Sequence, residues 1–153
     1  MNVQRQVTVN APADKVWNIL GADFTNISEW ASFVVESKPI PNMPEGSGRV
    51  CNVKGTGEVK ETIHKYDEDN RELAFVLEGK KIPFFMQKID NTWSVKPKGN
   101  DRSELQVNVD LTVMPVFKQL MSGMLRKQMS KTADSILGEL KYFAENDRAK
   151  VPA

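Results

Sequence analysis

A change of hydrophobic period near residue 114 constrains the fold of this chain more than any other feature. Residues 103–113 alternate apolar and polar side chains, which predicts a strand with one buried and one wet face. From Pro115 to about Glu145 the apolar residues recur at helical spacing, and proline suits the first turn of a helix. The predicted inward stripe is Phe117, Met121, Met124, Leu125, Gln128, Met129, Thr132, Ile136, Leu140 and Phe143. The chain therefore ends in one long helix that has a sheet to cover.

The rest of the chain predicts the sheet. Six further strands are expected at residues 3–9, 32–37, 49–53, 58–66, 72–79 and 86–95. Two short helices, "APADKVWNIL" and "DFTNISEW", follow the first strand, and Gly21 is expected to end the first of them. Short turns between strands make the sheet antiparallel. The expected fold is α+β: a curved seven-stranded antiparallel sheet wrapped around the long C-terminal helix.

Size and charge narrow the possible functions. A chain of 153 residues favours one domain, here residues 1–146, with residues 147–153 as a disordered tail. The net charge of +1 gives no reason to expect a nucleic-acid partner. One cysteine and one histidine cannot form a usual zinc site, and no other cofactor is indicated. No segment has the apolar length of a membrane span or a secretion signal, so a cytoplasmic location is expected.

One strand contains a carboxylate where core is expected. In "GEVKETIHKYD" (57–67), period-two alternation puts Val59, Glu61, Ile63 and Lys65 on one face, and His64 and Tyr66 on the other. Glu61 would line a partly wet cavity if the fold has one there. Alternatively, a bulge could turn it outward, or Lys65 or Arg49 could pair with it as part of the scaffold. His64 on the outer face is expected to be a surface residue.

The order of these motifs resembles the helix-grip fold of the START-related superfamily, which includes birch-pollen-allergen-like proteins, and in particular its polyketide cyclase/dehydrase branch. The resemblance rests on "VTVNAPADKVWNIL", "DFTNISEW", "GTGEVKETIHKYDEDNRELAFVL" and the closing "ELKYFAE", and it spans essentially the whole chain. It implies a cavity between the sheet and the long helix. It also implies that Glu61 stands where hormone receptors of this fold use a glutamate to reach their ligand through water. Cys51 stands where the family often has an arginine, and Arg49 could substitute for it.

The candidate ligand-binding residues are those expected to face that cavity. Glu61 and Asn91 would orient the ligand, and methionines on the helix could adapt to its shape. The apolar run "KKIPFF" is expected to form a gate over the cavity mouth, consisting of Ile82, Pro83, Phe84 and Phe85; alternatively, its rings pack on the end of the long helix or form a dimer contact. The full candidate set is Phe33, Val35, Glu61, Phe75, Leu77, Asn91, Trp93, Val107, Phe117, Met121, Met124, Leu125 and Gln128.

Three functions fit this sequence. The first is binding or transport of a small, largely apolar molecule, such as a lipid, in the cavity. The second is a cyclase or dehydratase that uses the same pocket, for which Glu61 could serve as one of the two acid–base groups required. The third is a protein-interaction module with a filled core. The sequence names neither the ligand nor the oligomeric state, and it does not show whether Glu61 has a charge partner.

Overall fold

The computed structural model describes residues 1–150. Its elements follow the predicted order of one strand, short helices, six strands and one long helix. The strands are β1 (Asn2–Val9), β2 (Val34–Pro39), β3 (Gly48–Val53), β4 (Gly57–Asp67), β5 (Glu72–Glu78), β6 (Met86–Pro97) and β7 (Ser103–Val113). The helices are α1 (Ala13–Trp17), the π-helical turn η1 (Asn18–Ala22), the 3₁₀ helix η2 (Phe24–Glu29) and α2 (Pro115–Asn146).

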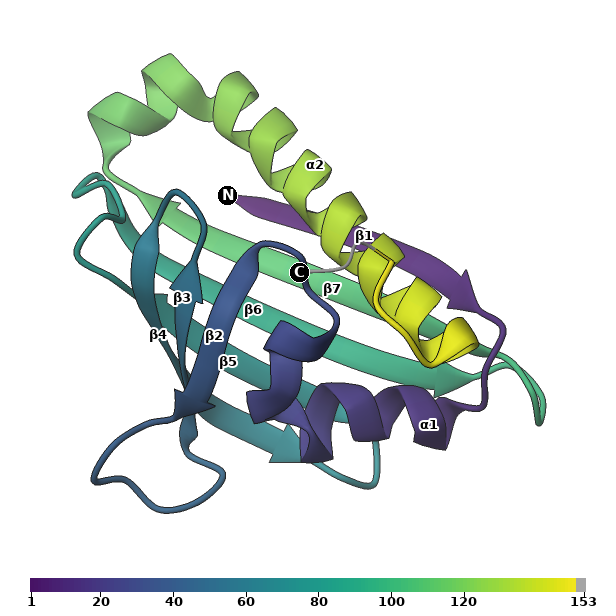
Figure 1. Ribbon diagram of the computed structural model, residues 1–153. Helices are drawn as coiled ribbons and strands as arrows, with labels where there is room; N and C mark the ends of the chain where they lie inside the picture. Colours follow the sequence, from purple (N-terminus) through teal and green to yellow (C-terminus); the bar gives the residue numbers. More distant parts are fainter. Residues whose placement is uncertain (151–153) are drawn as a thin grey trace.

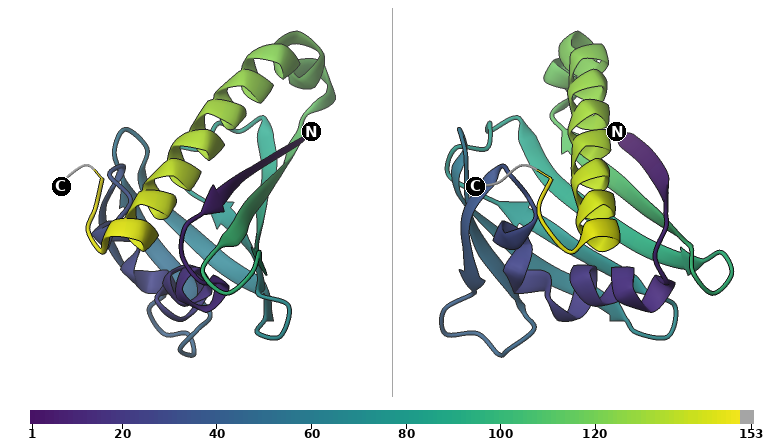
Figure 2. Two further views of the ribbon diagram at one scale, coloured as in Figure 1. Left: turned by 90° about the vertical axis from the view of Figure 1, so that its right-hand side faces the viewer. Right: turned by 45° about the vertical axis from the view of Figure 1, so that its right-hand side comes forward.

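The strands form one antiparallel sheet in the order β1-β7-β6-β5-β4-β3-β2. The sheet curves, and α2 crosses its concave side diagonally, with the short helices closing the same side at one end (Figure 1, Figure 2). This is the helix-grip fold, so the predicted fold class is confirmed. None of the helices in residues 1–150 is both long and apolar enough to span a membrane.

The first short helix does not end at Gly21 as predicted. The chain widens into the turn η1 instead, and Gly21 lies inside it. A Cβ atom at this position would lie 2.9 Å from the hydroxyl oxygen of Tyr66 and 3.2 Å from the ring of Trp17. Close approach of these two side chains, rather than helix termination, explains the glycine.

A bulge in β4 corrects the face assignments of the second half of that strand. The pairing of β4 with β5 shifts between Ile63 and Lys65, so the residues after His64 exchange faces. Tyr66 therefore lies on the same face of the sheet as the short helices, where its ring is 5.2 Å from that of Trp17 and stays 45% exposed. Lys65 pairs with Glu72 on the other face. The bulge lies beyond Glu61, whose inward position is unaffected. His64 is exposed beside Asp90, on the predicted face.

Two apolar clusters divide the interior along α2. The larger one joins the short helices, the sheet and the C-terminal half of α2, and it includes the fully buried Leu105 and Leu140. The smaller one joins the N-terminal half of α2 to the ends of β6 and β7 through Leu111, Val113 and Leu125. Helix α2 ends at Asn146, and the next residue, Asp147, has a left-handed backbone and pairs with Lys15 at 2.9 Å. Of the expected disordered tail, residues 151–153 lie outside the described part of the chain.

Candidate functional site

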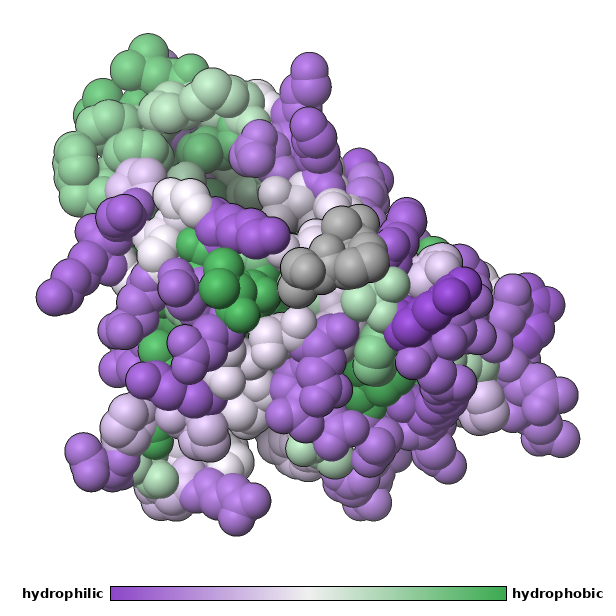
Figure 3. All heavy atoms as spheres, viewed as in Figure 1, coloured by the Kyte–Doolittle hydropathy of each residue, from purple (hydrophilic) through white to green (hydrophobic). Residues whose placement is uncertain are grey.

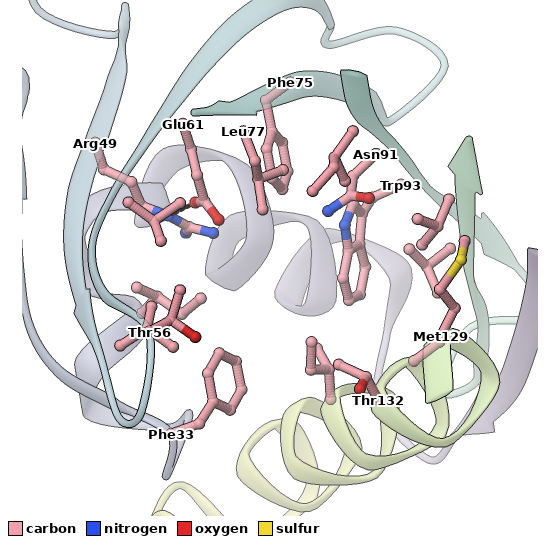
Figure 4. Close-up of a pocket in the computed structure, with 18 of the residues that line it drawn as sticks. Phe33, Arg49, Thr56, Glu61, Phe75, Leu77, Asn91, Trp93, Met129 and Thr132 are labelled. Atoms are coloured by element: carbon pink, nitrogen blue, oxygen red, sulfur yellow. Dashed lines mark hydrogen bonds and ion pairs between the residues drawn. The ribbon is translucent and has the colours of Figure 1, made fainter. Parts of the chain in front are cut away.

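A cavity of about 340 Å³ lies between the sheet and α2. In Figure 4 the side chains of Glu61, Leu77, Asn91 and Trp93 extend from the sheet towards a space that Phe33 and Thr132 close from the opposite side. The lining residues are Ile19, Leu20, Ile27, Trp30, Phe33, Arg49, Val53, Thr56, Val59, Glu61, Phe75, Leu77, Ile82, Ile89, Asn91, Trp93, Val107, Val109, Gln128, Met129, Thr132, Ala133 and Ile136. Such a space between sheet and helix is not the filled core that the interaction-module hypothesis required.

The only two titratable groups among those lining residues, Arg49 and Glu61, form an ion pair. Pairing of β3 with β4 places them directly opposite each other, and both side chains are largely buried. The Arg49 guanidinium also donates to the backbone carbonyl of Phe24 at 2.5 Å and lies 3.7 Å from the centre of its ring. Two of the three readings considered for Glu61 therefore apply together, because it faces the cavity and has Arg49 as its charge partner.

Two polar atoms in the wall of the cavity have no partner within the described structure. They are the Asn91 side-chain oxygen and the Trp93 indole N–H, and both are buried. The two residues lie on the same face of β6 and both line the cavity. A buried polar group without a hydrogen bond costs about 1–3 kcal/mol, so a ligand that bonded these atoms would recover that cost.

A second carboxylate, which the sequence analysis did not single out, fixes the chain beside the cavity. Glu139 on α2 is 6% exposed. It accepts hydrogen bonds from the backbone N–H of Ser32 at 2.9 Å and from the Ser32 hydroxyl. This contact attaches the segment before β2, and with it the lining residue Phe33, to the long helix. Glutamate at a buried helix position was the available signal, but the helical stripe alone does not reveal its partner.

Cys51 is buried beside the Arg49–Glu61 ion pair but does not line the cavity. Burial raises the pKa of its thiol to about 11, and the negative charge of Glu61 acts in the same direction. The thiol therefore stays protonated at neutral pH and is a poor nucleophile. Within residues 1–150, no three His, Cys, Asp or Glu side chains are grouped as metal ligands.

Eight of the candidate ligand-binding residues meet around the cavity. They are Phe33, Glu61, Phe75, Leu77, Asn91, Trp93, Val107 and Gln128. Val35 does not belong with them, because it is 57% exposed on the edge strand β2. Regular alternation from Phe33 would have turned it inward, but the strand begins at Val34, which is buried, and is irregular between Val34 and Glu36.

The helix residues nearest the N-terminus of α2 lie outside the cavity. Phe117, Met121 and Leu125 pack in the smaller apolar cluster, and Met124 is 60% exposed. The predicted stripe included too many residues at this end, because the first turns of α2 extend past the sheet (Figure 2). Among residues 115–126 only Leu125 is buried. The helix lines the cavity farther along, at Gln128, Met129, Thr132, Ala133 and Ile136.

Only one of the four residues of the expected gate lines the cavity. Ile82 lines the cavity, whereas Pro83, Phe84 and Phe85 do not. The ring of Phe85 stacks on Phe117 at 4.7 Å, and Phe84 meets Phe117 edge-on at 5.5 Å. Two rings of the "KKIPFF" loop thus pack on the start of the long helix, which is one of the alternatives that the sequence left open.

Three lining residues from the short helices, and Trp30 directly after them, were not among the candidates; the three are Ile19, Leu20 and Ile27. The sequence analysis predicted the two short helices but did not assign any of their side chains to a cavity wall. Val53 and Thr56, near the β3–β4 turn, also line the cavity. Their position depends on how far that turn folds towards α2, which strand patterns do not determine.

Comparison with known proteins agrees with this geometry. The family model described as polyketide cyclase / dehydrase and lipid transport matches residues 1–145. A search of curated protein sequences gave no significant match.

Solved structures share the fold at low sequence identity. A START superfamily protein from Mycobacterium smegmatis superposes with a TM-score of 0.68 and 20% identity, over 93% of this chain and 98% of the other. The Zhui aromatase/cyclase from Streptomyces sp. R1128 superposes with a TM-score of 0.68 and 17% identity, over 96% of this chain and 97% of the other. Truncated norcoclaurine synthase from Thalictrum flavum superposes with a TM-score of 0.72 and 14% identity, over 95% of this chain and 94% of the other. At these identities the likeness concerns the fold alone.

Proposed function

Because the chain belongs to the polyketide cyclase/dehydrase and lipid transport family, we propose that it binds a small, largely apolar molecule in the cavity between the sheet and α2. The observation that carries the proposal is the pair of unpartnered polar atoms, on Asn91 and Trp93, in a wall that is otherwise mostly apolar. A cavity of about 340 Å³ is within the usual range for small-molecule sites.

The lining supports a ligand that is mostly apolar and carries a few polar groups. Aromatic and aliphatic side chains would supply most of the affinity, at roughly 25 cal/mol for each Å² of apolar surface removed from water, before the cost of association. One oxygen on the ligand would accept from the Trp93 N–H, and a neighbouring hydroxyl or amine could donate to Asn91. The Arg49–Glu61 pair lies on the other side of the cavity from Asn91 and Trp93 (Figure 4). It would favour a second polar group at that end of the ligand.

The cavity opens beside the middle of α2. Gln128 and Thr132 line it and are also exposed, and the lining residues Phe33, Thr56 and Ile82 are partly exposed. We propose that a ligand enters and leaves between these residues. This gives Ile82 the part of the gate that was expected of the whole "KKIPFF" loop.

A cyclase or dehydratase using the same cavity is the second candidate. The observation that favours it is a buried arginine–carboxylate pair facing the ligand space, which could polarise a carbonyl group. Two observations rank it lower. Glu61 is already occupied by Arg49, and the described lining residues supply no further acid or base.

Native mass spectrometry of the purified protein, followed by denaturing extraction, would test the binding proposal. We expect a discrete small-molecule adduct that weakens in Trp93→Phe, which removes the indole N–H and keeps an aromatic ring. If no adduct is found, a panel of apolar ligands with one or two polar groups is screened by thermal shift. No stabilisation by any of them, in a protein that is folded by circular dichroism, would contradict the proposal.

A further inference from the structure

The N-terminal end of α2 carries a cluster of exposed apolar side chains that serve neither the core nor the cavity. Phe84 is 77% exposed, Val116 67%, Leu120 79% and Met124 60%; we call these four residues the apolar tip. Val116, Leu120 and Met124 are spaced four apart, which puts them on one face of the helix. Phe84 joins them from the neighbouring loop through its contact with Phe117. Figure 3 shows apolar surface gathered at this end of the molecule.

The surroundings of the apolar tip are strongly basic. Residues 114–133 contain Lys118, Arg126, Lys127 and Lys131 and no acidic residue, and residues 79–85 add Lys80 and Lys81. These two segments hold six of the 21 basic residues of the chain and none of its 20 acidic ones. Among the described residues, none of these six takes part in an ion pair. The charge is therefore available to an anionic partner.

Apolar and basic residues are arranged in sequence along one helix face. Lys127 and Lys131 follow Met124 by three and seven residues, so they continue the line of Val116, Leu120 and Met124. The end of the helix projects beyond the sheet, which makes the apolar tip a convex end rather than a groove (Figure 2). A convex apolar end with lysines behind it suits a lipid surface, where the apolar groups enter the interface and the lysines meet anionic headgroups.

We propose that the apolar tip docks on an anionic membrane surface. A second copy of the chain fits less well, because a two-fold contact through this surface would bring the two sets of lysines together. The tip also adjoins the cavity: Ile82 lies two residues before Phe84, and Gln128 lies one turn beyond Met124. Docking would therefore bring the cavity mouth to the lipid surface, a consequence that rests on the proposed ligand-binding function.

Vesicle co-sedimentation tests the docking. The full chain is mixed with phosphatidylcholine vesicles that contain or lack phosphatidylserine. We expect binding to be at least about tenfold tighter with phosphatidylserine and to weaken as salt is added. The double variant Phe84→Asp/Leu120→Asp should lose at least about tenfold in affinity, because it places charges where apolar groups would enter the interface. Val35→Asp is the control, since Val35 is an exposed apolar residue on β2, outside the apolar tip, and this variant should bind like the unchanged chain.

Other outcomes would overturn the docking. They are absence of binding to either vesicle, equal binding to both, or equal losses in the double variant and in Val35→Asp. A molecular mass in solution that rises with protein concentration, and that falls to the monomer mass in the double variant, would assign the apolar tip to self-association instead. None of the substituted residues lines the cavity, so ligand binding should persist in all variants. Loss of vesicle binding with retained ligand binding thus separates failure of the docking from failure of the proposed function.

Discussion

Arg49 and Glu61 face each other across β3 and β4 and form an ion pair in the wall of the cavity. The arginine is further held by the Phe24 carbonyl and by the faces of Phe24 and Phe75. This arrangement accounts for a carboxylate in a strand face that is otherwise apolar. It also ties η2 to the sheet at the same point.

Removing the carboxylate alone should destabilise the protein. Glu61→Gln leaves the Arg49 charge buried without its partner, which is expected to lower the free energy of unfolding by about 3 kcal/mol. The double variant Arg49→Met/Glu61→Leu removes both charges and should lose less. Urea denaturation measures the free energy of unfolding of both variants. Equal losses in the two proteins, or no loss in Glu61→Gln, would mean that the pair is not buried as described.

Gly48 should be intolerant of any side chain. Its φ is +149°, and a Cβ atom there would lie 2.0 Å from the backbone oxygen of Glu61. Gly48→Ala must therefore separate β3 from β4, and a loss of about 3 kcal/mol or more is expected in urea denaturation. Gly46 is the control: its φ is +83° and no atom lies within 4 Å of its Cβ position. Gly46→Ala should lose only about 1 kcal/mol, and a reversed order would contradict this account of the strand pairing.

The Ser32–Glu139 contact should hold the segment that carries Phe33. Glu139→Ala removes both acceptors and is expected to lower the free energy of unfolding by about 2 kcal/mol. Ser32→Ala keeps the bond from the backbone N–H and should lose less. Hydrogen exchange at the Ser32 amide gives the specific readout, because it should accelerate in Glu139→Ala and stay slow in Ser32→Ala. Slow exchange in both variants would show that the carboxylate does not hold this amide.

Cys51 should make stability depend on pH in the alkaline range. Burial raises the thiol pKa from 9.0 to about 11 in the folded protein. Between these two values the unfolded chain releases the thiol proton and the folded chain keeps it, so stability falls as pH rises from about 9 to about 11. Cys51→Ala lacks this contribution and should lose less stability over the same range. Parallel stability curves for the two proteins would contradict the raised pKa.

The fold could be predicted because its signals are local and repeated. Alternation over residues 103–113, helical spacing after Pro115 and short turns specify strands, a helix and antiparallel pairing without knowledge of any contact. The same alternation correctly turned Glu61 and Asn91 to the side where the cavity lies. It failed at Val35 and Lys65, because an irregular pairing in β2 and a bulge in β4 each exchange the faces.

The limits of the site could not be predicted because they depend on distances between elements. Met124 and Gln128 both belonged to the predicted stripe, yet only Gln128 lies far enough along α2 to face the cavity. Glu139 was missed because its partner, Ser32, is more than 100 residues away in sequence. A periodic pattern identifies a face of an element, but it does not identify what that face meets.

The central claim, a ligand cavity between the sheet and α2, is tested most directly by filling it. Leu77 lines the cavity, while Val76 on the same strand faces away from it. Binding of the fluorescent probe 1-anilinonaphthalene-8-sulfonate is titrated against the unchanged chain, Leu77→Trp and Val76→Trp. The account predicts saturable binding that falls at least about tenfold in Leu77→Trp and persists in Val76→Trp. Equal binding by all three proteins would place the probe elsewhere and contradict the claim.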